Sequence, residues 1–573
     1  EMDNTPPQLV SWMPGPEDAI PATRQSMQRP GDPVILFFDE PLDPASIFDS
    51  ISLIENGVPV SDLQIQSDGT ALVISPRAGL KHGIPYSVAV DGLKDLAGNT
   101  ASTSSLDFNL PAIEDNGAPS NKGFPLALTT YPGYPCETSY ADTLDLDNGV
   151  FGKCWTGDDA NSGDLLPVSQ MPADRPITVV FSKTMDLDSI ILGNTFVVQQ
   201  VSQEPDGSVT VVNSEVPGRL EKNHQRIRFY PEAPWEVGAH YRYTLASSET
   251  PSTCLEGQYS SICDTDGIPL KTDLLEGVDD GDGDNGPDNL EIFFTGAEAA
   301  KTVFTPLRNL PIRDTNSNLA IDCDSLGSED CLEPFNHEGN DAEGYLPSAN
   351  AAKLLVTADH ASDARVGCAV SGSDCPKKKF IYQTYALNTE VIGPGIDPET
   401  GKEGVKVLLY PTQLATTSLE VHLSLLSTVS QTGPQVLRMR YAKDDPNCEG
   451  AGCPRNSLIP GVIVENDNGE TVFKTKAELF LDAPGLSAAI GTIPLPLEHN
   501  LFAYPFTLEL EGRVTFFDDG RMQIEQRNRN IPHIDVEALA IGLISTEIPL
   551  IIPEQGVYLN FISNPVKDLP AQQ

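Results

Sequence analysis

Basic residues are scarce in this sequence, and no long apolar run occurs in it. The chain carries 36 Lys and Arg against 82 Asp and Glu, which gives a formal net charge of −46 and an isoelectric point near 4.3. Such a charge repels phosphate backbones and anionic lipid surfaces, so nucleic-acid binding is excluded as a class of function. No apolar stretch reaches the ~18–20 residues of a membrane span. The longest candidate, residues 539–552, is interrupted by Ser545, Glu547 and Pro549.

A secretion signal is also missing from the printed sequence. The first residues, Glu1, Met2 and Asp3, provide neither a basic segment nor an apolar one. We therefore expect a mature or trimmed form, and a lipid anchor upstream of it stays open.

Sequence signatures of enzymes are absent as well. The chain has no G-x-S-x-G elbow, and His337-Glu338 is not followed by a histidine at position 341. The eight histidines are scattered without metal-ligand spacing. We therefore expect no catalytic residues and no enzyme. Paired carboxylates for glycoside chemistry stay open, because they converge only in three dimensions.

The ten cysteines fall into five couples that are close in sequence. Each couple brackets a polar stretch, which is typical of disulfides that close surface loops in an oxidising compartment. Tight metal-thiolate spacing does not occur. The pairs expected from loop economy are Cys136–Cys154, Cys254–Cys263, Cys323–Cys331, Cys368–Cys375 and Cys448–Cys453. The location that follows is extracellular or at a bacterial cell surface.

Composition and pattern predict an all-β protein. With 46 glycines and 48 prolines, the sequence favours short strands and many turns over long helices. Its 573 residues suggest roughly three to five domains. Strand-like runs at 34–38, 52–54, 71–74 and 86–90 predict a β-sandwich of about 100 residues at the start of the chain.

An internal repeat predicts a second copy of this sandwich. Residues 34–47 and 177–190 align without a gap and share Phe38/Phe181 and Asp43/Asp186. Further on, Pro76, Gly83 and Tyr86 match Pro231, Gly238 and Tyr241 at a larger offset. We therefore expect Phe38 and Phe181 to occupy equivalent core positions.

These residues carry a family resemblance. The strand that ends in Phe38, the acidic turn after it, the G-x-x-Y strand and the D-x-A-G-N turn at 95–99 resemble the bacterial Ig-like domain of the S-layer SbsA type. The first copy would span about 5–110 and the second about 125–297. The second copy lacks the D-x-A-G-N turn, and an insert from Ser247 to Asn289 occupies its place. In this family such domains are mostly spacers or presentation modules of secreted and surface proteins.

The remaining part of the chain is β-rich and does not repeat this pattern, and we recognise no family in it. Alternating patterns at 419–425 and 506–511 predict strands with one buried face, and 462–473 reads as a hairpin. We expect domains at 1–112, 113–298 and 299–573, the last a large β-sandwich or barrel.

The strongest chemical motif is an acidic loop at 280–291. Side-chain oxygens recur there at the spacing of a calcium loop, which resembles thrombospondin type 3 and dockerin-like repeats. The expected ligands of a structural calcium ion are Asp280, Asp282, Asp284, Gly286, Asp288 and Glu291. Asn285 stands where such loops usually have glycine. A soluble acidic linker is the alternative.

A weaker loop of the same kind follows. Its candidate ligands are Asp314, Asn316, Asn318 and Asp322, but its twelfth position is Ser325. The alternative there is a turn-rich loop between disulfides. The pairs Asp145/Asp147 and Asp264/Asp266 are expected to be turn residues.

Three functions are compatible with these features. The first is a non-enzymatic secreted or surface protein, in which calcium-stabilised Ig-like modules form a stalk that presents the C-terminal domain for adhesion, for envelope or matrix assembly, or for a surface complex. Its partner would be a protein or a glycan at the cell surface. The second is a surface protein that holds a lipid, another hydrophobe or a glycan in the C-terminal domain, where the apolar stretches 493–497 and 548–553 could line an opening or form core edges. The third is an extracellular hydrolase.

Overall fold

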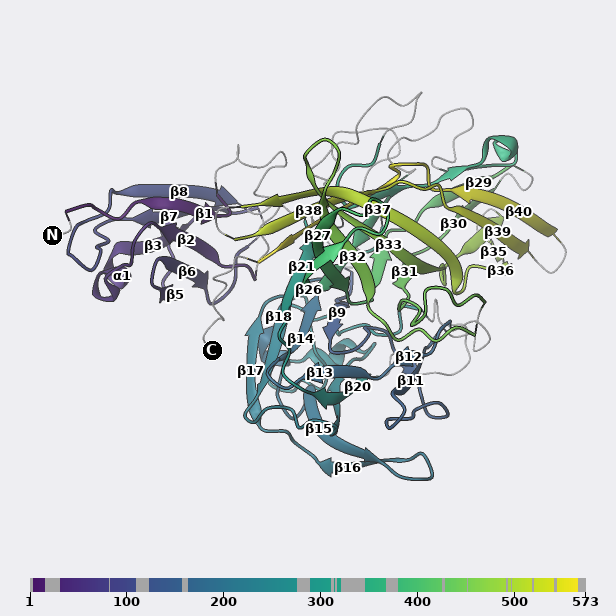
Figure 1. The fold of residues 1–573 in the computed structure, drawn as a ribbon, viewed down its shortest axis with the longest axis horizontal. Coiled ribbons are helices and arrows are strands. Elements are labelled where there is room, and N and C mark those ends of the chain that lie inside the picture. Colours follow the sequence, from purple (N-terminus) through teal and green to yellow (C-terminus); the bar gives the residue numbers. More distant parts are fainter. Residues whose placement is uncertain are drawn as a thin grey trace.

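The computed structural model describes most of the chain. The described residues are 4–15, 31–81, 83–109, 123–156, 163–275, 289–310, 314, 317–320, 346–366, 380–424, 428–450, 452–490, 493–495, 497–517, 520–540 and 544–564. Within them the protein is all-β, as predicted, with a single short α-helix. Three parts follow one another along the chain, and Figure 1 shows the first at the left, the second below and the third above and to the right.

The first unit, residues 4–109, is a sandwich of two four-stranded sheets, ordered β1-β2-β6-β5 and β4-β3-β7-β8. Its core lies between the sheets and includes Leu36, Leu72 and Val88, none of which is exposed. The elements are β1 (Leu9–Met13), β2 (Val34–Phe38), α1 (Pro44–Ser50), β3 (Ile51–Glu55), β4 (Val58–Pro59), β5 (Leu63–Asp68), β6 (Ala71–Pro76), β7 (Pro85–Val90) and β8 (Ser104–Asn109).

The second unit, residues 123–297, repeats this strand order. Its main sheets run β9-β14-β18-β17 and β16-β15-β19-β20, with β13 added in parallel beside β20 and a small sheet β10-β11-β12 from the first insert. The elements are β9 (Ala127–Tyr131), β10 (Thr138–Ser139), β11 (Val150–Cys154), β12 (Leu166–Pro167), β13 (Ser169–Pro172), β14 (Ile177–Phe181), the 3-10 helix η5 (Leu187–Ser189), β15 (Phe196–Gln203), β16 (Val209–Asn213), β17 (Gly218–Asn223), β18 (Arg226–Pro231), β19 (His240–Leu245), the 3-10 helix η6 (Pro251–Cys254) and β20 (Leu290–Ala297).

Equivalent residues of the two units make equivalent hydrogen bonds. Phe38 and Phe181 each end a central strand and are buried. Asp43 and Asp186 cap α1 and η5, and each side chain accepts a bond from the N–H two residues further on. The hydroxyl oxygen of Tyr86 accepts from the N–H five residues before it, and Tyr241 does the same.

The second unit also has a counterpart of the turn that its sequence lacks. The side chain of Asp95 accepts a bond from the N–H four residues on, and its carbonyl accepts from the glycine N–H three residues on. Asp264 makes both of these bonds in residues 264–268. The turn is therefore present, although only Asp and Gly of the D-x-A-G-N pattern remain. The D-x-A-G-N pattern did not predict this turn, because its hydrogen bonds need the aspartate and the glycine but not the other residues.

The third unit, residues 303–564, contains a sheet that closes on itself. The ring has eight strand positions, each antiparallel to its neighbours. Two strands share each of four positions: β21 and β22, β25 and β26, β27 and β28, and β31 and β32. The other four positions are single strands: β33, β37, β38 and β41. We call this ring the closed sheet. Its strands are β21 (Val303–Asn309), β22 (Ala351–Lys353), β25 (Phe380–Thr384), β26 (Ala386–Ile396), β27 (Glu403–Leu409), β28 (Gln413–Thr416), β31 (Gln435–Met439), β32 (Ile459–Glu465), β33 (Thr471–Asp482), β37 (Tyr504–Phe516), β38 (Met522–Asn528) and β41 (Val557–Ser563).

Two smaller sheets extend the closed sheet at one end, at the right of Figure 1. Their strands are β23 (Leu355–Val356), β40 (Ile544–Ile551), β39 (His533–Ala540) and β36 (Leu497–His499), and β24 (Ala364–Val366), β29 (Glu420–Leu423), β30 (Thr428–Gln431), β34 (Ser487–Ile490) and β35 (Ile493–Leu495). The 3-10 helix η7 (Ala358–His360) lies between β23 and β24. Val421, Val536 and Leu550 belong to the same core cluster as the interior of the closed sheet. The stretch 548–553 is therefore part of the core here.

Candidate functional site

The interior of the closed sheet is packed with apolar side chains that alternate along each strand. Leu387, Leu437, Leu479 and Leu559 are all buried in it. The space left between them is a cavity of about 40 Å³. Since an apolar cavity that takes up a molecule as small as benzene measures about 150 Å³, this cavity has no room for a long apolar ligand.

A few polar side chains face this cavity. Gln383 is 1% exposed, and its amide oxygen has no hydrogen-bond partner among the described residues. The Tyr385 hydroxyl donates to Asn350 at 3.0 Å, and burial raises its pKa well above the ordinary value. An ordered water donating to Gln383 fits both the size and the chemistry of the cavity.

The opposite end of the closed sheet, where its long hairpins turn, carries exposed apolar side chains. Val303, Ile396, Val405 and Phe516 are exposed by 61%, 68%, 38% and 64%. We call these four residues the apolar rim. They come from four different strands, so the rim spans much of the ring.

Strand register shows which way the rim faces. Val303 lies opposite Val391, and Phe516 lies opposite Met522. Both partners pack against the interior core, as does Ile463 opposite Val405. Directly opposed residues of an antiparallel pair project from the same face. The rim therefore faces the inside of the closed sheet and continues its core outward.

Charged residues of β33, of the turn between β26 and β27 and of the segment after β38 pair with one another near this end. Lys474 donates to Asp397 at 2.9 Å, and Arg529 donates to Glu399 at 2.6 Å. Burial opposes ionisation of Asp397, but hydrogen bonds from Thr400 and Lys474 outweigh it and lower its pKa to about 2. On the rim side, Glu403 lies opposite Ile396, so one carboxylate borders the apolar side chains of the rim.

A buried ion pair joins the second unit to the closed sheet. Both terminal nitrogens of Arg175 donate to Glu390, at 2.7 and 2.6 Å, and Arg175 also donates to the Tyr131 hydroxyl. Burial raises the pKa of the Glu390 carboxyl, but the bonds from Arg175 outweigh this effect and hold it below its ordinary value. The Tyr410 hydroxyl donates to Glu390 from the other side.

An apolar core shared by both parts surrounds this contact. Leu128, Tyr134 and Phe293 of the second unit pack in one cluster with Val436 and Tyr441 of the closed sheet. The Tyr134 hydroxyl lies within hydrogen-bond distance of two backbone carbonyls of the third unit, those of Thr412 at 3.0 Å and Met439 at 3.2 Å. The second unit therefore lies against the wall of the closed sheet, in contrast to the stalk expected from the order of the domains.

Three of the five predicted disulfides lie among the described residues, and all three form. They are Cys136–Cys154, Cys254–Cys263 and Cys448–Cys453. The cysteines 323, 331, 368 and 375 lie outside the described residues, so those two pairs stay predictions. Local pairing succeeds because each loop is short, with sequence separations of 18, 9 and 5 residues.

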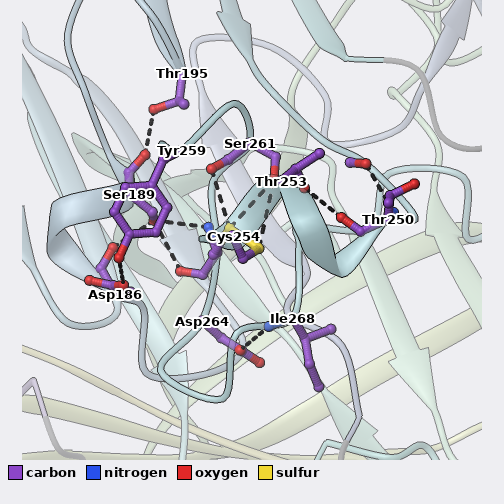
Figure 2. Close-up of a disulfide and its surroundings, with 12 residues drawn as sticks. Asp186, Ser189, Thr195, Thr250, Thr253, Cys254, Tyr259, Ser261, Asp264 and Ile268 are labelled. Carbon is purple, nitrogen blue, oxygen red and sulfur yellow. Dashed lines mark hydrogen bonds between the residues drawn. A yellow bond between two sulfur atoms is a disulfide. The ribbon is translucent and has the colours of Figure 1, made fainter. Parts of the chain in front are cut away.

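Figure 2 shows the Cys254–Cys263 disulfide beside the turn at 264–268. The Cys263 N–H donates to the Ser189 hydroxyl at 2.9 Å, which ties the loop to η5. The Tyr259 hydroxyl donates to Asp186 at 2.5 Å, and this bond raises the pKa of Tyr259 to about 12. The two hydrogen bonds thus fix the insert to η5 and its cap, and the disulfide closes the loop that carries them.

The expected calcium loop lies mostly outside the described residues. Asp280, Asp282, Asp284, Gly286 and Asp288 are in that undescribed stretch. Glu291 is described in β20, where its carboxylate accepts a bond from the Tyr140 hydroxyl and lies 3.4 Å from Arg242. These contacts occupy the side chain that was expected to close the site.

The second loop is described only in part. Asp314 accepts a bond from the Leu319 N–H at 2.9 Å, and Asn318 accepts one from the Ala320 N–H at 2.9 Å. Asn316 and Asp322 lie outside the described residues. Among the described residues, no group of three or more His, Cys, Asp or Glu side chains has the arrangement of a metal site.

The two acidic fragments differ in their surroundings. Asp145 accepts bonds from Asn148 in an exposed turn, as expected. Asp264, beside its turn bonds, forms a 2.5 Å ion pair with Lys183, which also contacts Asp266 at 3.2 Å. Burial raises the pKa of Asp264, and Lys183 opposes this effect. The sequence analysis missed Lys183, Arg175 and the rim, because their partners lie far away in the sequence.

Comparison with known proteins identifies one part of this architecture. Residues 3–109 match the bacterial Ig-like domain family. The match covers the first unit, where the predicted resemblance was strongest. No helix of the described residues has the length and the hydrophobicity needed to cross a membrane.

One relative extends over the whole chain. Alkane uptake protein B of Marinobacter nauticus is 78% identical over 576 residues, which cover 100% of this chain. The chain spans about half (54%) of that relative's length. The three disulfides are typical of a protein that is extracellular or located in the cell envelope.

Two solved structures of the S-layer protein SbsC are also similar. One covers 86% of this chain and 65% of its own at 13% identity and a TM-score of 0.16. The other, with domains 1–6, covers 94% and 66% at 12% identity and a TM-score of 0.19. These scores are too low to support an argument about the fold.

Proposed function

We propose that this chain is a non-enzymatic, surface-exposed part of a bacterial alkane uptake system, in which it acts as a rigid platform. The name of the relative that is 78% identical supplies the process. The packed interior of the closed sheet supports a platform over a container, because its cavity of about 40 Å³ is too small to carry an alkane. A platform that contacts alkane or a partner at its surface fits this interior better than a container.

The second unit acts in this proposal as a second Ig-like module that braces the closed sheet. Its strand order, its two capping aspartates and its turn at 264–268 support this assignment. The buried Arg175–Glu390 pair and the shared core fix the module to the wall of the closed sheet. A protein or glycan partner at the cell surface, and adhesion through it, belong to the same proposal.

Structural calcium in the loop 280–291 is part of the proposal too. Closely spaced carboxylates repel one another unless a cation neutralises them. Replacing Glu291 would also remove its contacts with Tyr140 and Arg242, so Asp282 is the better residue to test. We expect a chelator to lower the melting temperature of the chain, and Asp282→Ala to remove this sensitivity. A melting temperature that ignores the chelator would mean that the loop is an acidic linker.

Uptake measurements test the function itself. Deleting the coding sequence of this chain in its bacterium should lower the uptake of radiolabelled n-hexadecane and leave acetate uptake unchanged. Unchanged hexadecane uptake would refute the proposal. Conversion of hexadecane by the purified chain would show that it is an enzyme.

A further inference from the structure

The apolar rim is the feature that the platform role does not explain. Isolated exposed apolar side chains are common on proteins, but this group is contiguous with a core and opens at the end of a closed sheet. We infer that the apolar rim binds one alkyl chain of a neutral alkane. This inference rests on the proposed function, which names the substrate class, and it adds the place of contact.

Beneath the rim lies an apolar floor. Val391, Ile463 and Met522 are half-buried and pack directly against the interior core. Phe473, which lies opposite Ile463, is completely buried below them. An alkyl chain seated on the rim therefore covers apolar side chains and removes water from both itself and the floor.

The size of the rim favours a single chain over a protein partner. A stable protein interface buries about 800 Å² on each side. An aromatic side chain contributes about 150–250 Å² and aliphatic ones less, so the rim's one aromatic and three aliphatic residues fall well short of that area. A patch of this size matches a small apolar ligand.

Charge separates an alkane from other apolar surfaces. The chain carries a net charge of −46, and near the hairpin turns at this end the acids Glu403, Glu465, Asp467 and Glu470 outnumber the bases Lys402 and Lys406. A second copy of the chain or an anionic bilayer would meet like charge there. A neutral alkane carries no charge, so the acidic side chains around the rim do not repel it.

The test uses the purified full chain with the fluorescent apolar probe 1-aminoanthracene and with n-decane as competitor. We expect the probe to bind and n-decane to displace it. The double variant Ile396→Ser/Phe516→Ser should bind the probe about tenfold more weakly, because it loses most of the exposed apolar surface of the rim. The matched control is Phe48→Ser on α1, since Phe48 is 70% exposed and far from the rim in sequence.

Equal loss in Phe48→Ser and in the rim variant would overturn the inference, as would a rim variant that binds like the unmodified chain. Equal melting temperatures of all variants show that folding is not the cause. If the rim fails this test while deletion still lowers hexadecane uptake, the proposed function stands without this site. If the rim binds decane but deletion leaves uptake unchanged, the site stands and the proposed function fails.

Discussion

The first and second units share a strand order but differ in how they meet the rest of the chain. The first touches its neighbours through polar contacts, such as the Asp32–Arg308 ion pair and a bond from Asn223 to the Gly31 carbonyl. The second contributes apolar side chains to a core that it shares with the closed sheet. No core cluster of the described residues combines the first unit with another. The same fold thus serves as an attached module in one place and as part of a larger body in the other.

Core substitutions should separate the two units most clearly. Leu36→Ala in the first unit and Phe293→Ala in the shared core should each cost about 3–5 kcal/mol. Because the cores are separate, we expect Leu36→Ala to lower only one of two unfolding transitions. Phe293→Ala should lower the other, which comprises the second unit and the closed sheet together. Calorimetry measures both, and a single transition that both variants shift equally would contradict the contrast.

The buried ion pair offers a sharper version of this test. Arg175→Met leaves Glu390 buried without its partner and should cost about 3 kcal/mol. The double variant Arg175→Met/Glu390→Leu should recover much of that loss, since no charge then remains buried. Denaturant unfolding measures both variants. A double variant that is as unstable as Arg175→Met would show that the loss comes from the missing contacts of Arg175 and not from an unpaired buried charge.

Reducing conditions should destabilise the second unit but not the first, because only the turn at 264–268 lies beside a disulfide. Replacing Cys254 and Cys263 by serine should destabilise the second unit by about 2–3 kcal/mol, as expected for a loop of this length. The equivalent turn of the first unit, residues 95–99, contains no cysteine and should not respond. Hydrogen exchange of the two turns, with and without the substitution, measures the difference. Equal protection in both proteins would mean that hydrogen bonds alone hold the loop.

Between pH 6.5 and 4, a pH effect is expected in the third unit, at β36. Burial lowers the pKa of His499 to about 4, whereas an unfolded histidine titrates near 6.5. Between these values the unfolded chain binds the extra proton, so stability falls as the pH drops from about 6.5 to 4. At pH 5 the loss should be about 1–2 kcal/mol. His499→Gln should flatten this part of the stability curve, and an unchanged slope would assign it to another group.

Local features of the sequence predicted what local physics controls. The strands around Phe38 and Phe181, the capping aspartates and the three described disulfides all depend on neighbours within a few residues or on short loops. The closure of the third unit could not be predicted, because it depends on pairing between strands such as β21 and β41. For the same reason Arg175 gave no signal, since its partner lies 215 residues away.

The pairing of β21 with β41 also has a consequence for how the protein is made. Leu307 lies opposite Ser563, so the ring cannot close until almost the whole third unit has emerged from the ribosome. Until then, two strand edges with unpaired backbone groups stay open to other chains. Contacts this distant in sequence form slowly. A cell that makes this protein must therefore keep it from aggregating during synthesis and export, and a chain that stops before β41 should accumulate as aggregate.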